Sequence, residues 1–233
     1  MRKAIVLSLA GALSCALSSQ AAIETQTQTQ SYGNSITPPF VTPLTFNGFN
    51  TALGTLTSVD LILTSTATVD VEIYDLNFTG PASPISFTQA EATFPVIATS
   101  ALAPGDQALT TSESMTAGPF SGTAVSGLND FPGMPATGTA SQSVTAASQL
   151  NAYETTPTFT VSVQSVTGTY SGSYTAPGDG SGLYFGGSAL EGGSVTVEYD
   201  YIPAAVPEPS TWFAACSIVA GSAVSIFRKT RRA

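Results

Sequence analysis

The chain has 233 residues, with six Lys and Arg, fifteen Asp and Glu, and no His. All six cations lie within a few residues of one end or the other, so residues 22–206 contain fourteen carboxylates and no side-chain cation. This body therefore lacks the side chains of a Ser-His-Asp relay, a Schiff-base lysine, an arginine phosphate clamp or a His-based metal site. Nucleic acid binding is excluded too, because it needs Lys and Arg to contact phosphate.

The N-terminus has the pattern of a secretory signal peptide. A positive start, Met1-Arg2-Lys3, precedes an apolar stretch over residues 4–17. The small residues that follow predict cleavage after Ala21, which makes residues 1–21 the signal and Ala22 the mature N-terminus. Two alternatives are a retained membrane helix, for which the apolar run is short, and lipid attachment at Cys15.

The C-terminus has the pattern of a membrane-stop segment. Residues 211–227 form an uncharged apolar stretch of seventeen residues, followed by a basic tail over residues 228–233. A helix of this length reaches about 25 Å, which makes it a marginal transmembrane span. The positive-inside rule places both basic ends in the cytoplasm and the acidic body on the far side of the inner membrane. The alternative is a buried core helix.

A proline-flanked glutamate stands before this helix, in a linker over residues 204–210. The motif is Val206-Pro207-Glu208-Pro209. Proline on both sides of the glutamate holds the segment extended, as a processing enzyme's cleft requires. Motif, apolar helix and basic end together resemble the PEP-CTERM sorting signal of exported proteins of Gram-negative bacteria, although this helix is richer in Ala and Ser than usual. A plain proline-rich spacer before a permanent anchor is the alternative.

The resemblance implies a partner and a destination. In that family an exosortase, a membrane-embedded cysteine transpeptidase, reads the tail and cuts near the motif. Pro207, Glu208 and Pro209 would be the residues recognised. The protein would be anchored transiently and then delivered to the cell surface or the extracellular biofilm matrix. PEP-CTERM proteins commonly occur with exopolysaccharide production.

The body is predicted to be an all-β domain over residues 22–203. Both cysteines, Cys15 and Cys216, lie outside it, so it folds without a disulfide. Apolar and polar residues alternate clearly in three segments and less clearly in two more: 68–74, 158–164, 194–201, 59–63 and 94–98. Roughly eight such strands predict an antiparallel β-sandwich, of jelly-roll or immunoglobulin-like type.

Two regions have weaker patterns. Residues 25–30 alternate Thr with Gln, which suggests an edge strand with little register information. Residues 101–157 are dominated by Ala, Gly, Ser, Thr and Pro, which predicts long loops. The segments 46–59 and 192–201 are similar to the choice-of-anchor E domain, a β family that often carries PEP-CTERM tails and implies no known activity.

Little in the body suggests catalysis, and we expect neither an enzyme nor a cofactor. A two-carboxylate glycosidase would have to draw on acids that no motif pairs: Asp70, Glu72, Asp75, Glu198 and Asp200. The segment 177–182 has one carboxylate where a calcium loop uses three or more, so a turn is the better interpretation. Because no cation can pair with them, nearly all the carboxylates are predicted to be exposed.

Carbohydrate binding is the alternative function. Tyr170, Tyr174 and Tyr184 lie in a stretch rich in Gly and Ser, and exposed aromatic faces among small polar residues suit a sugar ring. The competing interpretation is that these rings cap the core. The sequence thus predicts an exported, non-enzymatic surface or matrix protein, with an exopolysaccharide-binding module as the alternative.

Overall fold

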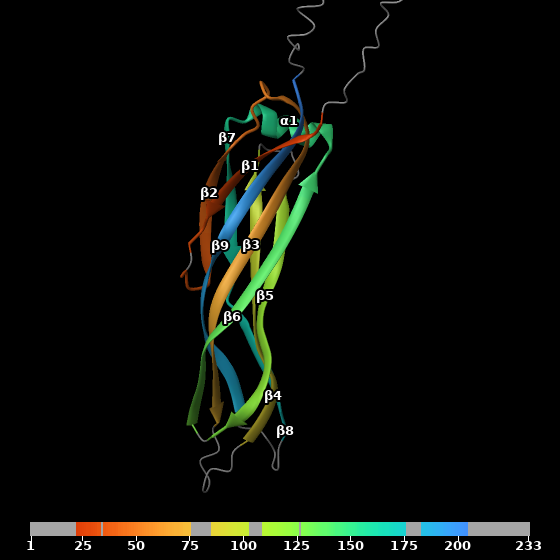
Figure 1. Ribbon diagram of the computed structural model, residues 1–233. Coiled ribbons are helices and arrows are strands. Elements are labelled where there is room, and N and C mark those ends of the chain that lie inside the picture. The colour runs from red at the N-terminus through yellow and green to blue at the C-terminus, as the bar shows by residue number, and fades with distance from the viewer. Residues whose placement is uncertain are drawn as a thin grey trace, which may run out of the picture.

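The computed structural model describes residues 22–33, 35–75, 85–102, 109–125, 127–175 and 183–204. They form two antiparallel sheets around one hydrophobic core (Figure 1), which confirms the all-β sandwich. Sheet A has the order β1 (Glu24–Ser31), β9 (Leu183–Pro203), β3 (Gly54–Asp75) and β6 (Gly127–Val144). Sheet B has the order β2 (Phe40–Asn47), β7 (Thr158–Ser165), β4 (Ile85–Ala101) and β5 (Thr110–Ala124), with β8 (Thr169–Thr175) also paired to β4.

Long strands with strict alternation hold the two sheets together. Strand β3 runs for 22 residues and β9 for 21, and they pair along their whole length with one irregularity between Leu56 and Ser58. Alternate side chains of β3 point inward and are fully buried, while Thr64, Thr66 and Thr68 face solvent. Because period-two alternation gives each strand one apolar face, the two sheets must bury those faces against each other.

Among the described residues there is one helix, α1 (Ala147–Thr155), which lies at the end of the sandwich where β7 begins (Figure 1). Its Leu150, Ala152 and Tyr153 are buried. The Tyr153 ring meets the Phe159 ring edge-on, with the ring centres 5.3 Å apart. The helix therefore covers this end of the core with an aromatic side chain.

The prediction of long loops over residues 101–157 was wrong. The segment contains all of β5 and β6, and helix α1. Its inward positions carry small side chains, such as Ala117 and Ala136, between outward Thr and Ser. Alanine and glycine carry little β-strand signal, so only pairing with β3 and β4 reveals these residues as strands.

In the part of the chain that the structure describes, no helix has the length and apolarity needed to cross a membrane. The predicted signal peptide over residues 1–21 and the predicted membrane helix over 211–227 lie outside the described residues.

The alternation on β3 makes a stability prediction. Leu63 is fully buried and its neighbour Thr64 is exposed. Replacing Leu63 with Ala should lower the free energy of unfolding by about 2–5 kcal/mol, because it leaves a cavity between the sheets. The matched control Thr64→Ala should change it by less than about 0.5 kcal/mol. Urea unfolding of the three proteins measures both values, and equal losses would contradict the assigned facing of β3.

Candidate functional site

The predicted processing sites fall at or beyond the limits of the described chain. Ala22 is described and exposed, ahead of β1, whereas Ala21 lies outside the described residues. The sorting motif Val206, Pro207, Glu208 and Pro209 also lies outside them. The remaining candidates belong to the body.

The three predicted tyrosines do not form one platform. The Tyr170 ring, on β8, is partly buried and meets the Phe94 ring edge-on, 5.8 Å between centres. Tyr174 lies further along β8 opposite Phe87 of β4. Tyr184 lies in sheet A, on β9. Tyr170 thus packs against the core, while Tyr174 and Tyr184 are exposed on different sheets.

Tyr184 instead joins a row that crosses three strands of sheet A. It is opposite Tyr74 of β3, which is opposite Leu128 of β6. Their side chains are 57 %, 38 % and 57 % exposed, respectively. We call Tyr184, Tyr74 and Leu128 the tyrosine row. The alternation on β3 already predicted that Tyr74 faces solvent, but only the strand register brings it beside Tyr184.

The tyrosine row has polar neighbours on the same face of the sheet. Two residues along each strand, Gly186 is opposite Glu72, and Glu72 is opposite Asp130. Glu72 and Asp130 are exposed. An apolar aromatic strip beside carboxylate acceptors can stack on the face of a sugar ring and accept hydrogen bonds from its hydroxyl groups.

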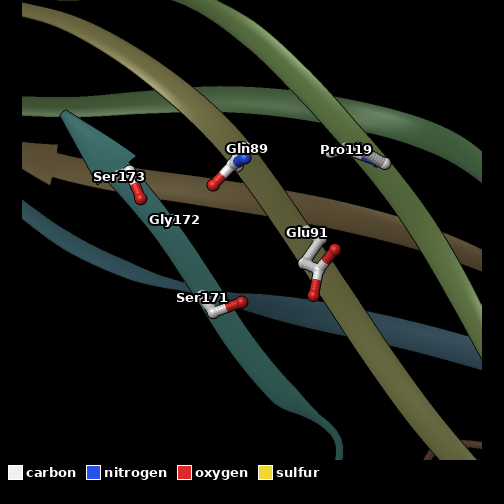
Figure 2. Close-up of a pocket in the computed structure, with 6 residues that line it drawn as sticks. All are labelled: Gln89, Glu91, Pro119, Ser171, Gly172 and Ser173. Carbon is white, nitrogen blue, oxygen red and sulfur yellow. The ribbon is translucent and has the colours of Figure 1, made fainter. Parts of the chain in front are cut away.

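A polar groove of about 310 Å³ lies over sheet B. Figure 2 shows Gln89 and Glu91 of β4 beside Ser171 and Ser173 of β8, with Pro119 of β5 across from them. Gln89 has a φ of 54°, a left-handed conformation that costs a non-glycine residue about 1–2 kcal/mol. It lies in an irregular part of β4, where the pairing with β5 and β8 shifts register. This bulge re-aims the side chains of β4 into the groove.

The groove contains groups that donate and accept hydrogen bonds. One carboxylate, one amide and two hydroxyls line it, together with Gly172 and the proline ring. None of these lining residues is aromatic. The groove can therefore bind a small polar molecule, but it offers no stacking surface.

The prediction that nearly all carboxylates are exposed was wrong. Glu191 of β9 is fully buried and Asp75 is 2 % exposed. Glu113 of β5 is partly buried, but both of its carboxyl oxygens are inaccessible to solvent. The oxygens of Glu113 and Glu191 have no hydrogen bond of ordinary geometry. Asp75 continues the inward series of β3 after Ile73, so the alternation already indicated its burial. Alternation could not reveal Glu113 and Glu191, because they occupy inward positions of strands with weak apolar patterns.

A glycine of sheet A makes room for the Glu113 side chain. Glu113 packs against Gly138, where a Cβ atom would come 2.4 Å from its Oε2. Ser65 of β3 lies opposite Gly138 in the sheet. The buried Tyr32 hydroxyl donates to the Ser65 hydroxyl at 2.6 Å. We call Glu113, Glu191, Tyr32, Ser65 and Ser165 the buried polar layer.

Burial decides the protonation of this layer. Desolvation raises the pKa of Glu113, and the Ser65 hydroxyl beside it opposes the shift. Desolvation likewise raises the pKa of Glu191, opposed by the Ser165 hydroxyl. Burial also raises the pKa of Tyr32 to about 12, and both glutamates add to that rise. Because the body has no Lys, Arg or His side chain to pair with a buried carboxylate, such a carboxylate loses its charge by binding a proton.

The acids considered for glycoside hydrolysis fall into two groups that lie far apart along sheet A, one at the end of β3 and the other on β9. Strands β3 and β9 are neighbours, but Glu198 is opposite Asp60, and Asp200 is opposite Ser58. Twelve residues separate Asp60 from Glu72 on β3, which corresponds to about 40 Å. The structure therefore does not bring Glu72 together with Glu198.

Surface carboxylates at this end of sheet A bind hydroxyl groups. Asp200 accepts from the Thr25 hydroxyl at 2.6 Å and from the Ser58 hydroxyl at 3.0 Å. Asp60 accepts from the Ser143 hydroxyl. In the described ranges there is no group of three or more His, Cys, Asp or Glu able to hold a metal ion. No family model matches this chain, and no curated protein matches it significantly.

The buried polar layer predicts a pH dependence of stability. The pKa of Glu191 is raised in the folded state, so the unfolded chain binds fewer protons and stability falls as pH rises through that folded pKa. The wild-type unfolding midpoint should therefore decrease between about pH 5 and pH 7. The unfolding midpoint of the Glu191→Gln variant, whose amide carries no charge at either pH, should decrease less than that of the wild type.

Thermal melts across this pH range test the prediction. The control Glu72→Gln removes an exposed carboxylate and should keep the wild-type slope. A wild-type midpoint that rises with pH would contradict the assignment of Glu191 as a destabilising buried acid.

Proposed function

We propose that this protein is an exported, non-enzymatic cell-surface or extracellular-matrix protein that an exosortase sorts through its C-terminal tail. The observation that carries the proposal is the order of three features at the end of the chain: the motif at 206–209, the apolar stretch at 211–227 and the basic cluster after it. Residues 1–21 would direct export, and the apolar stretch would anchor the protein until the tail is cut.

The composition of the body supports this route. Positive side chains hinder passage through the inner membrane and their position sets topology, and residues 22–206 have none. A sandwich stabilised by apolar burial also needs no disulfide to fold outside the cytoplasm. We further propose that the body has a jelly-roll or immunoglobulin-like strand arrangement and is a variant of the choice-of-anchor E domain.

The tail makes a processing prediction. The mature protein should begin at Ala22 and lack residues 211–233. Replacing Pro207 and Pro209 with Ala removes the constraint that keeps the motif extended, so an uncut precursor should accumulate in the membrane fraction. Mass spectrometry of both termini measures the outcome in the native host.

A matched control separates loss of recognition from general damage. Replacing Pro203 with Ala removes a proline at the end of β9 and should leave processing unchanged. Recovery of intact residues 212–227 in the released wild-type protein would refute the sorting proposal.

A second candidate function is binding of a neutral exopolysaccharide at the tyrosine row. The observation that favours it is the register that sets two exposed tyrosines side by side on a solvent-facing sheet. Glu72 and Asp130 next to the row, and an acidic body around it, would repel uronic acid polymers. A neutral glycan can stack on the rings and donate hydrogen bonds to the carboxylates without that penalty.

The tyrosine row makes a binding prediction. Replacing Tyr74 and Tyr184 together with Ala should weaken binding to a neutral soluble β-glucan about tenfold or more, because the stacking surface is lost. The control Tyr174→Ala removes an exposed tyrosine of sheet B and should bind like the wild type. Affinity electrophoresis in gels containing the glucan, or a uronic acid polymer instead, measures both. No retardation of the wild type by the neutral polymer, or equal loss in the control, would remove this candidate.

A further inference from the structure

Strand β1 forms an open edge of sheet A. It pairs with β9 on one side through eight consecutive residues without a register shift, and no described strand pairs with its other side. In an antiparallel sheet, about half of the N–H and C=O groups of such a strand point away from its partner. These groups can hydrogen bond to another extended chain.

The other edge strands of the described sheets are protected from such pairing. Proline, which cannot donate to a ladder, occurs in three of them: Pro43 in β2, Pro119 in β5, and Pro132 and Pro135 in β6. Strand β8 contains Gly172, and its pairing with β4 is broken by a register shift. Strand β1 has neither proline nor glycine, no Lys, and only Glu24 as a charge. It lacks the usual devices that keep a sheet edge from pairing.

Strand β1 is also held in the conformation that pairing requires. The Gln28 side chain donates to the backbone oxygen of Asn47 at the end of β2, and its amide oxygen accepts from the Asn47 N–H, both at 3.0 Å. Thr25 and Thr29 bond to side chains of β9. A strand already ordered by these contacts loses little conformational entropy when a second strand adds to it.

The sequence of β1 is complementary to itself. Thr25, Thr27 and Thr29 share the outer face with the outward, half-buried side chains of β9, and the intervening Gln residues point to the other side. With a twofold axis at Thr27, Thr pairs with Thr, Gln26 pairs with Gln28, and Glu24 lies opposite Gln30. With the axis at Gln28, Thr pairs with Thr or Ser and Gln pairs with Gln. The two Glu24 carboxylates are then about 20 Å or more apart, twice the Debye length at 0.1 M salt.

We propose that β1 pairs with β1 of a second copy of this chain, so that two A sheets join into one continuous antiparallel sheet. Eight residues give a seam about 27 Å long, which is short for a stable dimer, so the association is weak and depends on concentration. Because each body carries carboxylates and no side-chain cation, the two copies repel each other. Added NaCl screens that repulsion and should strengthen the dimer.

The test compares two double variants of the full chain, with Cys15 and Cys216 replaced by Ser in every protein. Thr27→Lys with Thr29→Lys puts cations at the open edge, where they face their own copies across the seam. Thr64→Lys with Thr66→Lys makes the same charge change on the same outer face, but in the central strand β3. Both variants keep the same terminal segments, so any association through the ends affects both equally.

We call the two proteins the β1 variant (Thr27→Lys with Thr29→Lys) and the β3 variant (Thr64→Lys with Thr66→Lys). In sedimentation across a concentration series, the β3 variant should self-associate at least as strongly as the wild type, because the added cations reduce the net repulsion. The β1 variant should associate about tenfold more weakly or worse. Equal association of the two variants, or a wild type that stays monomeric at high salt and concentration, would overturn the proposal.

A second measurement does not depend on the stability of the lysine variants. In the cysteine-free background, mild oxidation should link Thr27→Cys to its own copy for an axis at Thr27, and should link Thr27→Cys to Thr29→Cys in an equimolar mixture for an axis at Gln28, because those positions then lie opposite each other. Thr66→Cys, equally exposed but central in sheet A, should not. Cross-linking at Thr66 that is as fast as at Thr27 would place the contact elsewhere and refute β1 pairing.

Discussion

The constraint on which this structure depends is the absence of any side-chain cation between residues 22 and 206. No carboxylate of the body can form an ion pair with another side chain of the body. Four of the described acids outside the core, Glu24, Asp60, Asp70 and Asp200, instead accept hydrogen bonds from hydroxyls or from a backbone N–H group. Asp200 does so from Thr25 and Ser58, and Asp70 accepts from the Gly133 N–H at 2.8 Å. Stability therefore depends on apolar burial between the two sheets. Hydroxyl groups donate to the carboxylates here, as Lys and Arg side chains do in other proteins.

The same constraint explains the buried polar layer. Inside the sandwich the acids Glu113 and Glu191 have neither a cation nor a full set of donors. Their raised pKa values reflect burial, and only the Ser65 and Ser165 hydroxyls act against it. Gly138 of sheet A leaves the volume that the Glu113 carboxyl group occupies. This layer weakens the middle of the core as the acids ionise between about pH 5 and pH 7. The aromatic clusters at each end of the core have no group that ionises in this pH range. One end holds Phe46, Phe159 and Tyr153, and the other holds Phe87, Phe120 and Phe131.

Two surfaces of sheet A connect the fold to its proposed role outside the cell. Its outer face is mostly hydroxyl-bearing along β1 and β3 and becomes aromatic only at the tyrosine row. Its open edge at β1 is regular and uncharged except at Glu24. The proposed glycan binding depends on the tyrosine row of this face, and the proposed self-pairing depends on this edge.

The sequence alone determined the all-β class, the facing of β3, β7 and β9, and the charge map, because period-two alternation and composition are local properties of the chain. It also placed Thr25–Gln30 at an edge and Tyr74 on a solvent face. Strands β5 and β6 could not be recognised, since their small inward residues take their meaning from the partner strands that cover them. Only the tertiary structure decided that Tyr170 packs on Phe94, that Tyr184 lies beside Tyr74, and that Glu191 is buried. These facts depend on register and on the pairing of residues more than seventy positions apart, and no local pattern specifies such long-range pairing.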